Sequence, residues 1–104
     1  MALYKSITTD STTTLIDTGN GKGSVNVIKL TNISNTLSTN VTIFLEDMQT
    51  GGNPDYVILR TEMPPQTNLL LDEPKILSFN SNRYRMKILT ATVGGDASID
   101  IIIK

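Results

Sequence analysis

The stretch from Asp55 to Asp72, DYVILRTEMPPQTNLLLD, decides the fold class of this chain. It consists of a strand-like apolar run, the corner Glu62-Met63-Pro64-Pro65 and a second strand-like run. Two consecutive prolines fix two φ angles and remove two backbone donors, so this corner cannot lie inside a sheet ladder or a helix. The stretch therefore predicts two strands joined by a rigid connection.

Short alternating runs broken by polar turns also cover the rest of the chain. The ranges that read as strands are 3–9, 12–17, 24–33, 40–47, 56–61, 69–71, 75–79, 83–91 and 97–104. No window combines helix formers, caps and i, i+3, i+4, i+7 apolar spacing, so we expect no helix longer than one turn. About eight strands predict one all-β domain over residues 1–104, an antiparallel two-sheet β-sandwich of jelly-roll or immunoglobulin-like kind. A small barrel is the weaker alternative.

The turns between these runs predict how the strands connect. Residues 1–23 read as an extended arm or as an edge hairpin, and 24–33 with 40–47 read as a second hairpin. The sequence TVGGD, Thr92 to Asp96, predicts a hairpin turn before the final strand. Because that strand, 97–104, reaches the last residue, we expect it to leave a sheet edge that another subunit can cover.

Alternation along three strands also predicts which side chains share a face. Successive side chains of a strand point to opposite faces of the sheet, so every second residue shares a face. For the strand 83–91 we expect one of the two faces to meet the core. The shared faces are Ile28, Leu30 and Asn32; Tyr84, Met86, Ile88 and Thr90; and Ile99, Ile101 and Ile103.

Charge and residue usage exclude several classes of function. A net charge of −1 gives no cationic excess to neutralise nucleic-acid phosphates or an anionic membrane, so we expect neither partner. The chain has no histidine and no cysteine, which removes the commonest general base, the commonest metal ligand and any disulfide. We therefore expect no enzyme, with no catalytic, cofactor-binding or metal-binding residues. Because the N-terminus lacks the apolar core of a secretory signal, we expect a soluble protein that starts at its own Met1.

Two motifs resemble ligand sites and are better explained as turns. Gly19 to Ser24, GNGKGS, departs from the phosphate-binding loop because Gly23 follows Lys22 and a strand follows in turn. The acidic residues Glu46-Asp47, Asp55 and Asp72-Glu73 have no EF-hand spacing, so solvated turns explain them better than calcium ligation.

Three surface features are candidates for contacts with another protein. The first is the corner at Pro64 and Pro65, which also suits a plain connection between two sheets. The second is a basic stripe on one face of a predicted strand, which also suits a solvated face that discourages aggregation. The third is the N-terminal segment, which could reach a neighbouring subunit. The stripe consists of Arg83, Arg85 and Lys87, and the N-terminal candidates are Leu3 and Tyr4.

Four segments of the chain resemble the small β-sandwich virion structural proteins of tailed bacteriophages, particularly the marine and cyanobacterial type. They are Ile28 to Asn32 (IKLTN), Val41 to Leu45 (VTIFL), Met63 to Asp72 (MPPQTNLLLD) and Gly94 to Ile101 (GGDASIDI). The third segment is similar to the family pattern I-P-x-G-x-x-L-x-L-D. The resemblance covers most of residues 25 to 104. The chain departs from the family where Pro65-Gln66 replaces the usual glycine and where Ser81-Asn82 replaces the usual Gly-Asp.

The resemblance implies a non-enzymatic structural subunit that is present in many copies in the virion and is assembled in the host cytoplasm. It does not imply which part of the particle contains the chain. We expect a head decoration (cement) protein that binds the major capsid protein or other virion proteins as a homo-oligomer, with a trimer favoured. The alternatives are a neck, tail or fibre-associated module, and a small module that binds carbohydrate or a host surface.

Overall fold

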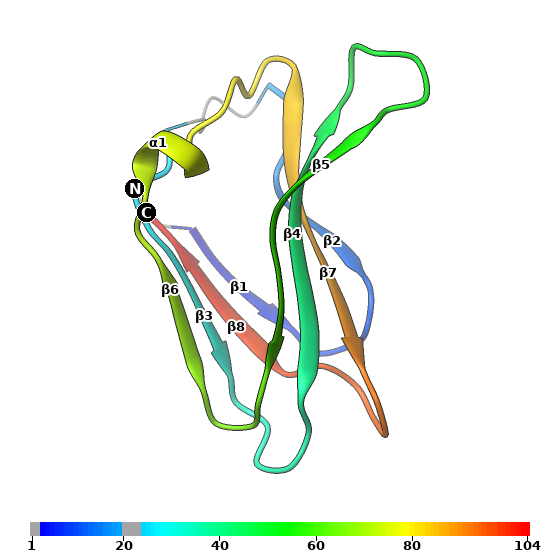
Figure 1. The fold of residues 1–104 in the computed structure, drawn as a ribbon, viewed down its shortest axis with the longest axis vertical. Helices are drawn as coiled ribbons and strands as arrows, with labels where there is room; N and C mark the ends of the chain where they lie inside the picture. Colours follow the sequence, from blue (N-terminus) through cyan, green and yellow to red (C-terminus); the bar gives the residue numbers. More distant parts are fainter. Residues whose placement is uncertain (1–2, 20–23) are drawn as a thin grey trace.

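The chain folds into two four-stranded antiparallel sheets that pack face to face, as seen in a computed structural model that describes residues 3–19 and 24–104 (Figure 1). The first sheet has the order β1-β8-β3-β6 and the second β2-β7-β4-β5. The strands of the first sheet are β1 (Leu3–Ile7), β8 (Ile99–Ile103), β3 (Ile28–Asn32) and β6 (Asn68–Leu71). Those of the second are β2 (Thr12–Ile16), β7 (Tyr84–Thr92), β4 (Thr39–Asp47) and β5 (Asp55–Met63). The predicted two-sheet β-sandwich is confirmed, and this strand order is that of a jelly roll.

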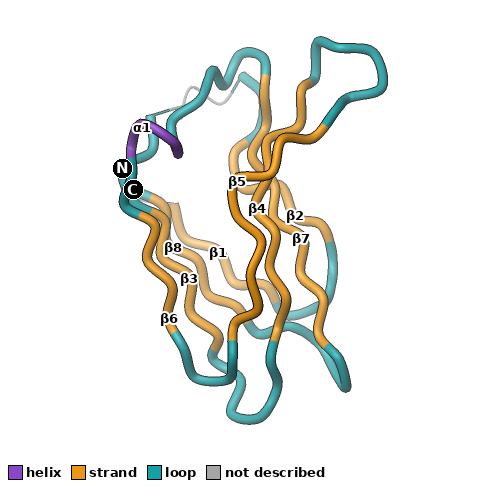
Figure 2. The backbone as a smooth tube through the Cα atoms, in the orientation of Figure 1, coloured by secondary structure: helices purple, strands orange, loops and turns teal. Residues whose placement is uncertain are grey.

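The chain passes from one sheet to the other at almost every connection (Figure 2). Among the strands of the described residues, only β4 and β5 are consecutive and pair with each other, and they enclose the loop 48–54. The hairpins that the sequence predicted elsewhere are therefore wrong. The strands β1 and β2 are edges of different sheets, β3 and β4 lie in different sheets, and the Thr92–Asp96 turn is a crossover from β7 to β8. A crossover needs the same turn residues as a hairpin, so the local pattern did not separate the two.

The prediction that the final strand leaves a free edge is also wrong. The strand β8 lies between β1 and β3 and pairs with both. The four sheet edges are instead β1 and β6 in the first sheet, and β2 and β5 in the second. The N-terminal strand, which was predicted as an arm or an edge, is thus an edge strand that covers β8.

Residues 75–79, which were predicted as a strand, lie mostly in the helical turn α1 (Pro74–Leu77). Pro74 stands in the first turn, where its missing N–H costs nothing and its fixed φ favours the helix. The backbone N–H groups of Ile76 and Leu77 both donate to the Glu73 carbonyl at 3.0 Å. Leu77 is buried, so this turn closes one end of the sandwich with an apolar side chain.

The core lies between the sheets, and each of the three shared faces predicted from alternation contributes to it. The three isoleucines of β8 that share a face are all buried, as are Met86, Ile88 and Thr90 of β7, whereas Tyr84 is only half-buried. The apolar core consists of Ile7, Leu15, Ile16, Val25, Ile28, Leu30, Val41, Ile43, Met63, Leu77, Met86, Ile88, Ala97, Ile99, Ile101 and Ile103. Asn32 is fully buried among them, so its amide requires hydrogen-bond partners within the protein.

Candidate functional site

The strongest candidate site is the open side of the sandwich where β5 and β6 lie, which we call the β5–β6 seam. These strands are edges of different sheets, and the short corner 64–67 joins them at one end. Figure 1 shows that they diverge from this corner toward α1. Each strand has a partner on one side only, so the backbone groups on its other side lie along the seam.

The corner of the seam is held by the buried amide of Asn32. Its Nδ2 donates to the carbonyls of Leu37 and Met63 at 3.0 Å and of Pro64 at 3.2 Å. Its Oδ1 accepts from the Ser34 N–H at 3.1 Å. Three carbonyls on one side and an N–H on the other fix which way the amide points. One side chain at the end of β3 therefore ties a loop and the proline corner together.

The residues after the prolines make the corner rigid. Gln66 has a φ of +58°, in the left-handed region that few residues other than glycine adopt. A proline followed by a positive φ is the signature of a type II turn. The Gln66 N–H donates to the Ser34 carbonyl at 3.1 Å, and the Thr67 hydroxyl donates to the Pro64 carbonyl at 2.6 Å. Pro64 and Pro65 thus form a fixed connection between the sheets, while their role as a contact site stays a prediction.

Two hollows lie along the seam, one at each end. The corner hollow measures about 260 Å³ and is lined by Thr61, Glu62, Met63, Pro64, Thr67, Asn68 and Leu69. The α1 groove measures about 210 Å³ and is lined by Ile58, Leu59, Leu70, Leu71, Asp72, Glu73, Ile76 and Leu77. Both hollows take residues from β5 and from β6, so each bridges the two sheets.

The α1 groove combines an apolar interior with an acidic rim. Leu77 is buried, whereas Leu70 and Ile76 are each 58% exposed. The carboxylates of Asp72 and Glu73 are exposed. Within residues 3–19 and 24–104 they make no ion pair and no side-chain hydrogen bond. An exposed apolar patch of this kind, rimmed by polar residues, is typical of an interaction surface.

Two residues of the predicted basic stripe, Arg85 and Lys87, lie on β7, which β4 separates from the seam strand β5, and they pair with carboxylates of the same chain. Lys87 contacts Glu46 at 3.1 Å. Arg85 lies 3.6 Å from Glu46 and 3.7 Å from Asp17, which is too long for hydrogen bonds. The stripe is therefore largely neutralised within the protein. A contact with another subunit through Arg85 and Lys87 stays a prediction.

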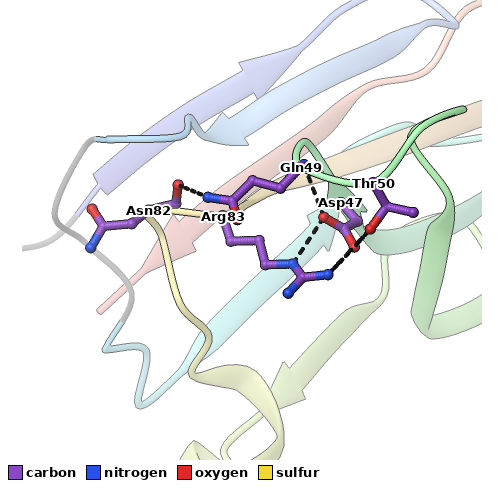
Figure 3. A network of polar contacts seen from close by, with 5 residues as sticks. All are labelled: Asp47, Gln49, Thr50, Asn82 and Arg83. Carbon is purple, nitrogen blue, oxygen red and sulfur yellow. Dashed lines mark hydrogen bonds and ion pairs between the residues drawn. The ribbon is translucent and has the colours of Figure 1, made fainter.

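Arg83, the third residue of the stripe, clamps the β4–β5 loop onto the start of β7 (Figure 3). Its Nε and Nη2 donate to the Asp47 carboxylate at 3.0 and 2.8 Å, a bidentate pair. The Thr50 hydroxyl and the Gln49 N–H donate to the same carboxylate at 2.6 and 3.0 Å. The Arg83 guanidinium and these donors hold the pKa of the Asp47 carboxyl well below its usual range. This network ties the β4–β5 loop to the residue that precedes β7.

The predicted N-terminal candidates have different environments. Leu3 is half-buried against the core, whereas Tyr4 is 71% exposed on the outer face of the first sheet. Tyr4 is in register with Ile102, which is in register with Lys29, and Lys29 with Leu70. Tyr4 and the groove residue Leu70 therefore stand at the two ends of one row of residues that crosses this face. Met1 and Ala2, at the start of the predicted N-terminal segment, lie outside the described residues.

The described residues cover the weaker sequence motifs only in part. Residues 20–23 of the GNGKGS segment lie outside the described residues. In the part of the chain that is described, no group of three or more acidic, histidine or cysteine side chains could hold a metal ion. Likewise, none of the described helices is long and apolar enough to cross a membrane.

Sequence reasoning missed the groove residues Leu70 and Ile76. A signal was present in the run Leu69-Leu70-Leu71, because alternation requires one of three consecutive leucines to point away from the core. Ile76 gave no such signal, since the segment around it was read as a strand instead of a helical turn.

Comparisons with known proteins extend the description of the fold only. The sequence matches no protein-family model, and no curated protein matches it significantly. Among solved structures, the chain is similar to the Yersinia pseudotuberculosis-derived mitogen, with a TM-score of 0.50 and 12% sequence identity over 99% of this chain and 81% of that one. At this identity the likeness shows a shared β-sandwich architecture.

Proposed function

We propose that the chain is a non-enzymatic structural protein of a bacteriophage virion, and specifically a capsid decoration protein. The observation that carries the proposal is the β5–β6 seam, where apolar side chains are exposed on a rigid frame. Tyr56 and Val57 are two further exposed apolar side chains of β5, with exposed fractions of 55% and 51%. Surfaces of this kind suit contacts with another protein better than the turnover of a small substrate.

The fold and the sequence resemblance add separate support. Jelly rolls are common in viral capsid proteins, although they also occur in lectins and cupins. Since a fold alone does not specify a function, the assignment to a virion depends on the resemblance of segments such as Met63 to Asp72.

Repeated contacts on a symmetric shell would give the stabilising effect. A single weak contact becomes effective when many copies, or the subunits of a trimer, bind together. The corner at Pro64 and Pro65 is fixed by the Asn32 amide, so little conformational entropy is lost when it is buried. We expect the contact surface to include this corner, Leu70 and Ile76.

Binding to capsids tests the proposal. Purified protein is mixed with expanded capsids of the phage that encodes it, and cosedimentation and the capsid melting temperature are measured. We expect saturable binding and a higher capsid melting temperature, together with a trimer in sedimentation-velocity experiments. Binding to isolated tails in place of heads would move the protein to the neck or tail. A monomer that ignores all virion parts and binds a glycan array would refute the proposal.

A further inference from the structure

We propose that the α1 groove is the docking site for an extended segment of a partner protein that carries an aliphatic side chain flanked by lysine or arginine. The inference rests on the proposed function, because it specifies the chemistry of the partner segment that would bind at the β5–β6 seam. The experiments below distinguish failure of this inference from failure of the virion assignment.

The size of the groove favours a side chain over a metabolite. Its volume is about 210 Å³. Pockets that enclose drug-sized ligands span roughly 300–1,000 Å³. The groove is also open on one side, because two of its lining residues, Leu70 and Ile76, are more than half exposed. An aliphatic side chain that enters from the surface would cover both and reach the buried Leu77.

The charges at the rim of the groove indicate which residues should flank the aliphatic side chain in the partner segment. Asp72 and Glu73 are adjacent, exposed and without an ion-pair partner in the described residues. Lys75 is the nearest cation along the chain, and it too forms no ion pair within the described residues. Two free carboxylates beside an apolar hollow are complementary to a segment with lysine or arginine next to its apolar residue.

The strand edges on either side of the groove explain why the segment should be extended. The strand β6 pairs only with β3, and β5 pairs only with β4, so both present unpaired backbone groups. An extended segment can add to such an edge through main-chain hydrogen bonds. The strand β6 has four residues, and Pro65 and Pro74 flank it closely. These prolines limit the added segment to a few residues and prevent open-ended sheet growth.

A binding experiment with defined peptides tests the inference. The probe is an end-blocked pentapeptide with lysine at both ends and Val-Leu-Val between them, titrated into the ¹⁵N-labelled protein. We expect the amide resonances of residues 57–59 and 70–77 to shift and the affinity to fall as salt is added. Peptides with glutamate at both ends, or with serine at the centre, should bind at least threefold more weakly.

Matched surface substitutions locate the binding site. Ile76→Ser should weaken binding at least threefold, whereas Ile33→Ser, at a site of similar exposure (54% against 58%), should not. Asp72→Asn should weaken binding and reduce its salt dependence, whereas Asp96→Asn, at an exposed position near the opposite end of the sandwich, should do neither. Unchanged melting temperatures would show that all four variants are folded.

Two results would overturn the inference. One is the absence of groove shifts at millimolar peptide, and the other is equal binding by the basic and acidic peptides. The capsid experiment separates this failure from failure of the proposed function. Wild-type protein that decorates capsids but binds no peptide refutes the groove inference alone. Protein that binds the basic peptide in the groove but ignores every virion part refutes only the virion assignment.

Discussion

Replacement of Asn32 tests whether one buried amide holds the proline corner in place. The amide donates to three carbonyls and accepts from one N–H, and it is fully buried. Each neutral hydrogen bond contributes about 1 kcal/mol net, and a buried group left without a partner costs at least that much. With two N–H groups and one acceptor lost, Asn32→Ala should lower the free energy of unfolding by about 3 kcal/mol.

The measurement is urea and thermal unfolding followed by circular dichroism. A loss of about 3 kcal/mol corresponds to a melting temperature that is lower by about 12 °C in a domain of this size. The control is Asn35→Ala, because Asn35 is exposed and, within the described residues, its side chain makes one hydrogen bond, which it accepts from Gln66 Nε2 at 2.8 Å. We expect the control to change stability by less than about 0.5 kcal/mol, as most surface substitutions do.

The isosteric Asn32→Asp variant adds a test that depends on pH. Its carboxylate would face the carbonyls of Leu37, Met63 and Pro64, so its pKa should lie above that of the unfolded chain, about 3.9. The penalty of an ionised carboxylate is then absent below pH ~4 and grows as the pH rises through the folded-state pKa. The variant should therefore be less stable relative to wild type at pH 7 than at pH 4. Equal losses at both pH values, or an Asn32→Ala loss no larger than that of the control, would refute the role assigned to Asn32.

Three further changes test the loop clamp, the turn and the strand order. Asp47→Asn should lower the melting temperature at pH 7. Its deficit should shrink as pH falls below ~4, because the unfolded wild-type chain then takes up a proton at this carboxyl while the folded-state pKa lies lower, so the stability gained from the charged group diminishes. Unfolding at pH 7 and pH 3 measures this. Gln66→Gly should raise stability by up to about 1 kcal/mol, since Gln66 has a positive φ, whereas Gln66→Ala should not. Ile101→Ala should cost about 2–5 kcal/mol and its neighbour Ile102→Ala much less, because only Ile101 faces the core.

The sequence predicted which side chains share a strand face, because the alternation that encodes the faces is local. Ile99, Ile101 and Ile103 could be grouped from their spacing alone, and all three are buried in the structure. Strand partners could not be assigned in the same way. The turn TVGGD suits a hairpin, yet it carries the chain to the other sheet, where β8 finds partners in β1 and β3. The choice between pairing and crossing depends on how all eight strands bury their apolar faces together.

The candidate site was predictable only in part for a related reason. The stiffness of Pro64 and Pro65 follows from the chemistry of proline, so the corner was found from the sequence. Its anchor was not, because Asn32 was placed on one face with Ile28 and Leu30 but two of its acceptors, at Met63 and Pro64, are about thirty residues away along the chain. The charges of the basic stripe follow from the sequence, but its carboxylate partners on β4 and after β2 are distant in sequence and could not be assigned.

The topology explains why the seam exists at all. If β5 and β6 formed a hairpin, each would satisfy the backbone groups of the other and no gap would remain between them. In the jelly-roll order they are edges of different sheets, yet only the residues of the corner 64–67 separate them along the chain. The strands must therefore meet at the corner and diverge beyond it, which leaves two unpaired edges around the α1 groove. The corner 64–67 joins the two sheets at one end of the seam. Because it joins strands of different sheets, β5 and β6 stay unpaired toward the other end, where the apolar surface of the α1 groove is exposed.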